Sequence, residues 1–212
     1  QFLASRGYAV LSMNFRGSTG YGRNHVKMAN GQWGRKMQDD VTDSVNWAVE
    51  QGIADPENVC IYGASYGGYA VMAGITKTPK MYKCAVNYVG VTDMELLFSK
   101  MPKVWEIWEE QQKIEIGDYD NDKEYLDAVS PINLVDRIET PLYIVHGVRD
   151  WRVPIQHAQK LRRELEKNGK VEGEDFWWMV KTDEGHGFYK EANKMELYSE
   201  LEKFFGRYLK DS

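Results

Sequence analysis

The sequence predicts an α/β protein with a mainly parallel β-sheet and helices on both of its faces. Apolar runs of strand length alternate along the chain with segments of helical periodicity, and this alternation is typical of parallel sheets. At residues 59–69 an apolar run ends in a small-residue turn and leads straight into a helical pattern. With 212 residues, 42% of them hydrophobic, the chain can bury one core. We therefore expect a single domain over residues 1–212.

The strands are expected where apolar runs are bounded by turn residues. Five runs have the length and composition of buried strands, at residues 8–15, 59–62, 84–89, 141–147 and 176–180. Apolar residues recur at helical spacing in four further segments, at residues 39–51, 66–77, 158–168 and 197–208. Each helical segment lies between two of the strands or follows the last one, as parallel connections require.

The region from about residue 91 to residue 139 has a different composition from the rest of the chain. Tryptophan and isoleucine are interspersed there with many acidic residues, which predicts amphipathic helices. An insertion at this place would overhang the carboxyl ends of the strands, where open α/β sheets bind ligands. A substrate lid and a set of packing helices with a solvated acidic face are both consistent with the pattern.

The pattern Gly63-x-Ser65-x-Gly67 lies where a predicted strand gives way to a helix. It is typical of a nucleophile elbow, a sharp turn that exposes a serine hydroxyl to a base. Gly63 allows close backbone approach before the bend, while Gly67 and Gly68 let the helix pack near the strand. The backbone N–H of Tyr66 points to where an oxyanion would form. A turn with a serine that only caps the helix is the alternative interpretation.

The sequence contains four histidines, and one of them suits the role of a catalytic base. His25 lies in a polar loop, His146 ends a strand and His157 begins a helix. His186 is flanked by glycines on a loop after the last strand, where an imidazole can take the serine proton and return it to the leaving group. We therefore assign His186 as the general base.

Three aspartates follow strands and could orient the imidazole. Asp150 follows the penultimate strand, which is the common position for this acid, whereas Asp93 follows the strand before it and stays open as a rarer arrangement. Asp183 is too close to His186 in sequence to face its ring easily. The favoured order of Ser65, Asp150 and His186 is that of the α/β-hydrolase fold. We predict this fold class, with the first strands lacking.

Composition excludes several classes of function. A formal net charge of −5 gives no basic surface for nucleic acid. No apolar run approaches a membrane span, and residues 1–6 have no signal-peptide layout, so we expect a soluble, cytoplasmic protein without a membrane partner. Cys60 and Cys84 lie in apolar runs and are interpreted as small buried thiols, with a disulfide between them as the less favoured alternative.

Five pieces of the sequence together resemble the catalytic domain of the prolyl oligopeptidase family of serine peptidases, especially its acylaminoacyl-peptidase-like and dipeptidyl-peptidase-like branches. The pieces are NFRGSTGYG at 14–22, GASYGGY at 63–69, SPIN at 130–133, His146-Gly147 with Asp150 and Val153-Pro154, and EGHGF at 184–188. The resemblance covers nearly the whole chain. It implies cleavage of short peptides or acyl-aminoacyl substrates through Ser65, with no metal or cofactor. It also implies an apolar pocket, which Tyr66, Val89 and Val91 could line.

The chain departs from this family in two ways. Members usually carry an N-terminal β-propeller, for which residues 1–212 hold no counterpart. The early strand and Gly-rich turn that supply the second oxyanion donor would precede Gln1. We therefore expect a fragment, or a sheet whose slot beside residues 59–62 is filled by another segment, a second copy or another chain. Loss of one oxyanion donor would lower turnover about 100- to 1,000-fold.

Two other functions stay open at this point. A carboxylesterase could use the same Ser65 machinery, because acyl-enzymes form more readily from esters than from amides. A catalytically silent module that mainly associates with itself or with a partner is the third hypothesis.

Overall fold

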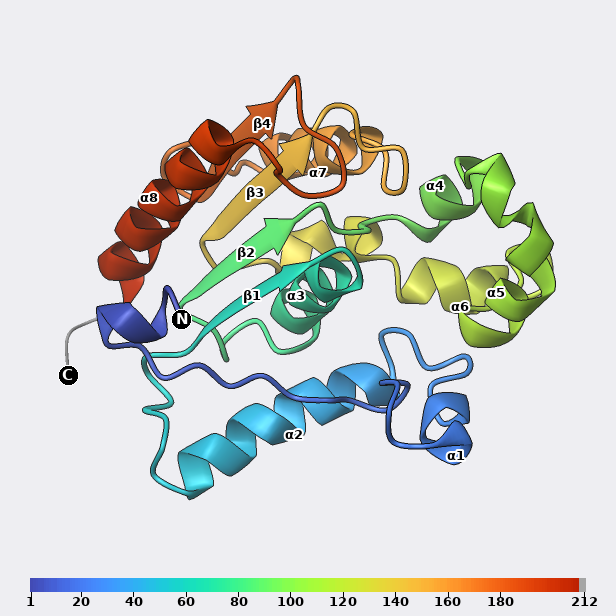
Figure 1. Ribbon diagram of the computed structural model, residues 1–212, viewed down its shortest axis with the longest axis horizontal. Coiled ribbons are helices and arrows are strands. Elements are labelled where there is room, and N and C mark those ends of the chain that lie inside the picture. The colour runs from blue at the N-terminus through green and yellow to red at the C-terminus, as the bar shows by residue number, and fades with distance from the viewer. Residues whose placement is uncertain (210–212) are drawn as a thin grey trace.

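The structure is a computed structural model that describes residues 1–209. These residues contain one four-stranded parallel sheet. The strands are β1 (Cys60–Ala64), β2 (Cys84–Tyr88), β3 (Leu142–Gly147) and β4 (Phe176–Lys181), paired in the order β1-β2-β3-β4 (Figure 1). The order in space equals the order in sequence, so each connection crosses over one face of the sheet. Four of the five predicted strands are confirmed, as is the α/β fold class.

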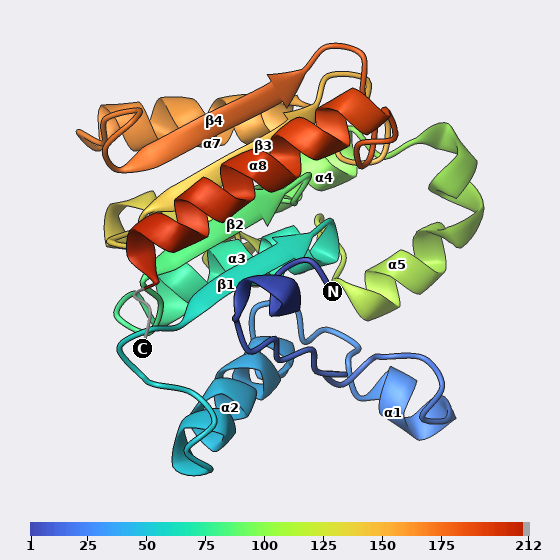
Figure 2. The same ribbon diagram turned by 60° about the vertical axis from the view of Figure 1, so that its left-hand side comes forward.

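Helices cover both faces of this sheet, as Figure 2 shows for α8 in front of the strands and α3 behind them. The α-helices are α1 (Arg23–Lys27), α2 (Lys36–Glu50), α3 (Tyr66–Lys77), α4 (Met94–Ser99), α5 (Glu109–Glu115), α6 (Lys123–Ala128), α7 (Gln156–Lys167) and α8 (Glu191–Tyr208). Short 3-10 helices occupy Ala4–Arg6, Lys103–Trp108 and Pro131–Arg137. None of the helices among residues 1–209 is both long and apolar enough to cross a bilayer.

An apolar core layer lies on each side of the sheet, and β3 contributes to both, while a third buried cluster joins α3 to α4 and α6. All six residues of β3 are buried. Leu142 and Ile144 face the layer shared with α3 and α7, whereas Tyr143 and Val145 face the layer under α8. Successive side chains of a strand point to opposite faces, which explains this division. Burial of each large apolar side chain contributes about 1.5–3 kcal/mol to the free energy of folding. This burial holds the strands that carry the site in place.

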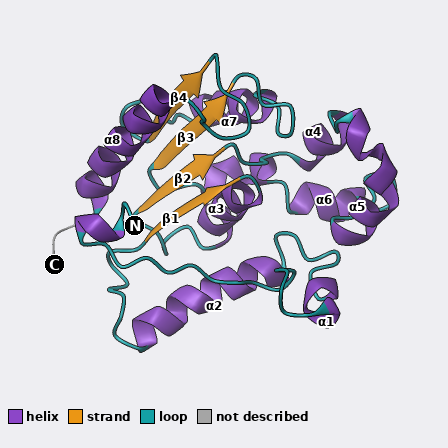
Figure 3. Ribbon diagram, in the orientation of Figure 1, coloured by secondary structure: helices purple, strands orange, loops and turns teal. Residues whose placement is uncertain are grey.

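The strand predicted at residues 8–15 is wrong for this structure. These residues run as a loop alongside α2 (Figure 3). Val10 and Leu11 are 57% and 49% exposed, and Arg16 ties the segment to Asp40 of α2 at 2.6 and 2.7 Å. A strand needs a neighbour for its N–H and C=O groups. In the described part of the chain nothing pairs with the outer edge of β1, and residues 8–15 join neither that edge nor any other strand.

The two cysteines form a disulfide, so the interpretation as separate buried thiols is wrong. Cys60 of β1 and Cys84 of β2 are direct register partners, with their Cα atoms 4.7 Å apart. Paired residues on adjacent strands point to the same side of the sheet, and this Cα separation lies in the range that a disulfide spans. Disulfides are rare in cytosolic proteins, and the cytoplasmic location stays a prediction.

Removal of this disulfide is expected to destabilise the protein without changing its fold. The bond closes a loop between residues 24 positions apart, and a loop of this size restricts the unfolded chain by about 3 kcal/mol. We expect the double variant Cys60→Ser, Cys84→Ser to lose about that much free energy of unfolding in urea titrations. The oxidised wild type, unfolded without reductant, should take up no alkylating agent. Alkylation of both cysteines under those conditions would contradict the assignment.

The region between β2 and β3 forms a lobe, defined here as α4 to α6, that projects past the tips of β1 and β2 (Figure 1). The indole rings of Trp105 in this lobe and of Trp151 in the loop after β3 lie 6.1 Å apart. Val104 and Ile107 of the lobe are 62% and 79% exposed. Helices are thus present in this region beside the carboxyl ends of the strands, but only α4 and α6 bury apolar residues, and α5 buries none.

Candidate active site

Ser65 lies on the turn between β1 and α3, in a conformation that few residues with a side chain adopt. Its φ is 58° and its ψ is −118°, which places the backbone at positive φ. Such a conformation costs of order 1–3 kcal/mol and persists only where surrounding contacts enforce it. The N–H of Ser65 donates to the carbonyl of Tyr88, and its own carbonyl accepts from the N–H of Tyr69. These bonds hold the hydroxyl at the carboxyl end of the sheet.

Three glycines, Gly63, Gly68 and Gly90, make room for this turn. The sequence pattern instead suggests Gly63, Gly67 and Gly68. A Cβ on Gly63 would lie 2.8 Å from the Cα of Gly67 and closer still to its carbonyl, where no side chain can fit. A Cβ on Gly68 would lie 2.6 Å from the Cα of Gly90. Gly67 itself has open space around the position of a Cβ. The expectation that Gly67 permits close packing of the helix is therefore wrong.

The structure brings Ser65, His186 and Asp150 together from three distant parts of the chain. The Oγ of Ser65 lies 2.9 Å from Nε2 of His186, and Nδ1 of the same ring lies 2.8 Å from Oδ2 of Asp150. Because a carboxylate only accepts hydrogen bonds, Nδ1 carries the proton and Nε2 is free to accept from the serine hydroxyl. This arrangement can remove a proton from Ser65 and stabilise the imidazolium that results.

Asp150 is buried, and its surroundings keep it ionised. Burial by itself raises the pKa of this carboxyl, but hydrogen bonds from His146, His186 and the N–H of Val153 outweigh it and hold the pKa well below its usual range. Oδ1 accepts the N–H groups of Arg152 and Val153, each at 2.9 Å. Since Oδ1 is fixed by two backbone donors, Oδ2 is left to face His186.

The loop that carries His186 is fixed by Glu184, a residue that sequence reasoning missed. The Glu184 carboxylate is buried and accepts the N–H groups of Tyr189 and Lys190, both at 2.9 Å. Its backbone carbonyl accepts the N–H of Arg149, which links this loop to the one carrying the acid. The only sequence signal is an acidic residue two positions before a glycine-flanked histidine.

Tyr88 supports the same loop from the end of β2. Its hydroxyl accepts the N–H of Phe188, and its ring lies edge-on to that of Phe188 with 5.3 Å between the centroids. Burial raises the pKa of Tyr88, so its hydroxyl stays neutral. Nothing in the sequence pattern distinguishes Tyr88 from any other apolar strand residue.

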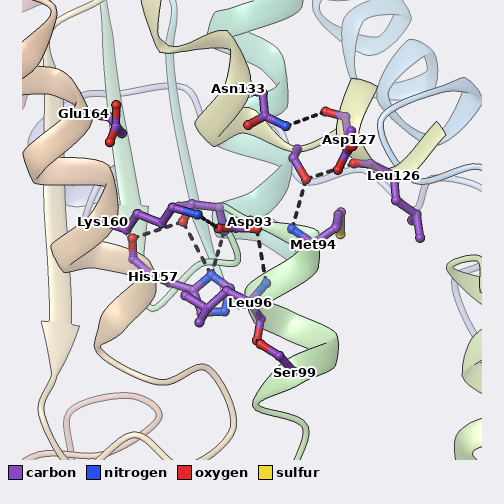
Figure 4. A network of polar contacts seen from close by, with 12 residues as sticks. Asp93, Met94, Leu96, Ser99, Leu126, Asp127, Asn133, His157, Lys160 and Glu164 are labelled. Carbon is purple, nitrogen blue, oxygen red and sulfur yellow. Dashed lines mark hydrogen bonds and ion pairs between the residues drawn. The ribbon is translucent and has the colours of Figure 1, made fainter. Parts of the chain in front are cut away.

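The other two candidate acids lie away from His186 and have different partners. Asp93 caps the start of α4 by accepting the N–H of Leu96 at 3.1 Å and forms an ion pair with Lys160 of α7 (Figure 4). Asp183 pairs with Lys190 at 2.5 Å on the surface. Neither carboxylate contacts the ring of His186. The geometry thus favours Asp150 over both alternatives.

The residues expected around the substrate occupy two different environments. The backbone N–H of Tyr66 has no acceptor among residues 1–209, and its phenol packs against Trp33, with 4.6 Å between the ring centroids. Burial raises the pKa of Tyr66. Val89 and Val91 are 2% and 3% exposed, so both side chains pack within the protein in this structure. Their place in a substrate pocket stays a prediction.

His157 is a buried histidine outside this site, and its burial makes stability depend on pH. Its Nδ1 accepts the N–H of Thr92 at 3.2 Å (Figure 4). Burial lowers the pKa of His157 to about 4 from 6.5, although Asp93 nearby raises it. Between these values the unfolded chain binds a proton that the folded chain does not. The stability contribution is therefore complete above the unfolded pKa and is lost as the pH falls toward about 4.

We expect the His157→Asn variant, whose amide oxygen can still accept from Thr92, to lack this pH dependence. For the wild type, this one group should lower the free energy of unfolding by about 2 kcal/mol between about pH 7.5 and pH 5. Urea titrations at both values measure the difference. An equal loss in the wild type and in His157→Asn would show that His157 is not the group responsible.

Comparison with known proteins places the chain in a family. Residues 1–212 match the sequence model of a family described as "Prolyl oligopeptidase family". The chain belongs to the prolyl oligopeptidase family. It is 40% identical over 212 residues to dipeptidyl aminopeptidase BIII of Pseudoxanthomonas mexicana, covering 99% of this chain and 30% of that protein. It is 27% identical over 219 residues to the acylamino-acid-releasing enzyme of Arabidopsis thaliana, covering 99% of this chain and 27% of that one.

Solved structures of two other peptidases have the same fold as this chain. A puromycin-hydrolyzing peptidase of Mycobacterium tuberculosis superimposes with a TM-score of 0.85 at 26% identity, over 94% of this chain and 29% of that one. Pyrococcus horikoshii acylaminoacyl peptidase gives a TM-score of 0.83 at 23% identity, over 93% and 32%. The predicted α/β-hydrolase fold and the predicted family are thus confirmed. The chain spans about 30% of the length of the curated relative to which it is 40% identical.

Proposed function

We propose that this member of the prolyl oligopeptidase family is a serine peptidase that cleaves short peptides or acyl-aminoacyl substrates through an acyl-enzyme on Ser65. The observation that carries the proposal is the continuous pair of hydrogen bonds from Ser65 through His186 to Asp150, at 2.9 and 2.8 Å. The names of the relatives, a dipeptidyl aminopeptidase and an acylamino-acid-releasing enzyme, support the substrate class.

The proposed reaction has two halves that use the same imidazole. His186 accepts the hydroxyl proton as Ser65 Oγ attacks the carbonyl carbon, and it then donates that proton to the leaving amine. Asp150 holds the ring in the tautomer with the proton on Nδ1 and stabilises the imidazolium. In the second half, His186 takes a proton from water as the water oxygen attacks the acyl carbon. His186 then returns that proton to Ser65 Oγ as the bond from the acyl carbon to Oγ breaks, which releases the carboxylic acid product.

The negative charge that forms on the carbonyl oxygen needs donors that are already in place. The N–H of Tyr66 is the first of α3, and the first N–H groups of a helix have no partner within it. We assign this N–H as one oxyanion donor, because it lies one residue from the nucleophile. Removal of a single such donor typically lowers turnover about 100- to 1,000-fold.

The substrate class can be tested by comparing amide and ester substrates that present the same acyl group. We expect the protein to hydrolyse both an acetyl-aminoacyl or dipeptidyl p-nitroanilide and the matching p-nitrophenyl ester, with the ester reacting faster. The Ser65→Ala variant should hydrolyse neither. Turnover of the ester without measurable turnover of any anilide would favour a carboxylesterase. Turnover of neither by folded protein would favour a module that only associates.

A further inference from the structure

A second histidine, His146, lies next to Asp150 of the proposed triad. The proposed reaction gives it no role. It is the penultimate residue of β3, and its side chain is 1% exposed. Its Nε2 lies 2.8 Å from the carbonyl oxygen of Val153 and 3.5 Å from Oδ2 of Asp150. A carbonyl and an ionised carboxylate can only accept hydrogen bonds, so Nε2 must carry a hydrogen. His146 therefore donates to the carbonyl of Val153, and Oδ2 of Asp150 lies 3.5 Å from the same nitrogen.

The contacts of His146 help to hold the segment from Asp150 to Val153 in place. The N–H of Val153 donates to Asp150 Oδ1 at 2.9 Å, while the carbonyl of the same residue accepts from His146. The backbone N–H of Val153 is thus bonded to Asp150, and its backbone carbonyl is bonded to His146. Oδ2 of Asp150 faces an imidazole on each side, with His186 at 2.8 Å and His146 at 3.5 Å.

We propose that His146 is a positioning residue of the proposed active site, whose N–H fixes the acid loop and thereby the direction in which Asp150 faces His186. The proposal rests on the function proposed above. Without this donor, the buried carbonyl of Val153 would be left unpaired and the carboxylate would lose one of its two lateral contacts. Small displacements of a catalytic group are costly, because reaction depends on near-attack geometry.

Two substitutions separate the N–H group from the mere presence of a side chain. In His146→Gln, the amide nitrogen can take the place of Nε2, still donating to Val153 and lying beside Asp150. In His146→Leu, the volume is largely kept but no donor remains. Both variants are first checked by urea titration, and reactions are run at a temperature where both are folded.

We expect His146→Leu to lower kcat on a p-nitrophenyl ester by about 10- to 100-fold, with KM changed less than about 2-fold. His146→Gln should stay within about 3-fold of the wild type on both constants. Wild-type kcat in the folded His146→Leu variant would overturn the proposal. Equal losses in the two variants would also overturn it, because the N–H would then not be what matters.

A second measurement tests the proposal even if the protein proves inactive. Spectra of protein with 15N-labelled histidine assign the tautomer of each ring, and we expect the hydrogen of His146 on Nε2. The resonance of the His186 Nδ1 proton should shift in His146→Leu and be unchanged in His146→Gln. A hydrogen on Nδ1 of His146, or an unshifted His186 proton in the leucine variant, would overturn the inference. Failure of Ser65 to react at all would instead count against the proposed function.

Discussion

The Asp150→Asn variant is expected to lose about 10⁴-fold in kcat on any substrate that the wild type turns over. An asparagine amide in this position can donate to Nδ1 of His186, which favours the tautomer that cannot accept the serine proton. The loss should fall on kcat more than on KM, because Asp150 is buried and contacts the base rather than the substrate. Steady-state rates measured with a p-nitrophenyl ester would show it.

Asp93→Asn is the matched control for this substitution, because both carboxylates are buried and follow strands. Its amide oxygen can still accept the N–H of Leu96, while the ion pair with Lys160 is lost. We expect folded Asp93→Asn to retain kcat within a few-fold, with a cost only in stability. The acid is misassigned if Asp93→Asn abolishes turnover and Asp150→Asn does not.

The Gly63→Ala substitution is expected to destabilise the protein by about 3 kcal/mol or more and to remove the reactivity of Ser65. The added methyl group would meet the backbone of Gly67, 2.8 Å from its Cα, and a backbone in a helix cannot yield as a side chain can. The turn would have to open, which would move the hydroxyl away from His186. Urea titration and the rate of reaction with a fluorophosphonate measure the two effects.

Gly67→Ala provides the contrast within the same motif. Gly67 has no positive φ, and a Cβ there would meet no atom within 4 Å. Alanine is also the better helix former by about 1 kcal/mol. We expect this variant to be as stable as the wild type and to react with a fluorophosphonate at a similar rate. If Gly67→Ala is damaged as severely as Gly63→Ala, the close approach of backbones is not what the motif requires.

Much of the fold and the site follows from local sequence signals. Four strands are fixed by apolar runs such as that at residues 141–147, and the residues that meet at the site are set by the order Ser65, Asp150 and His186 along the chain. Parallel strands bring their carboxyl ends to one edge of a sheet, so a residue placed just after each strand must arrive near the others. These features depend on periodicity and topology alone.

The features that sequence reasoning missed depend on contacts between distant segments. Residues 8–15 have the composition of a strand but form none, because strand formation depends on a paired neighbour as well as on apolarity. The bond between Cys60 and Cys84 depends on the register of two strands, which no local pattern specifies. The contacts of His146 and Glu184 appear only when the acid and histidine loops are placed side by side.

Covalent labelling of Ser65 is the sharpest test of whether His186 activates its hydroxyl as a nucleophile. The protein is treated with a fluorophosphonate probe, digested, and mapped by peptide mass spectrometry, with Ser65→Ala and His186→Ala treated in parallel. We predict a single adduct on Ser65 in the wild type, none in Ser65→Ala, and a greatly slowed reaction in His186→Ala. An unlabelled Ser65 in folded wild-type protein, or labelling that proceeds equally fast without the imidazole, would contradict the account.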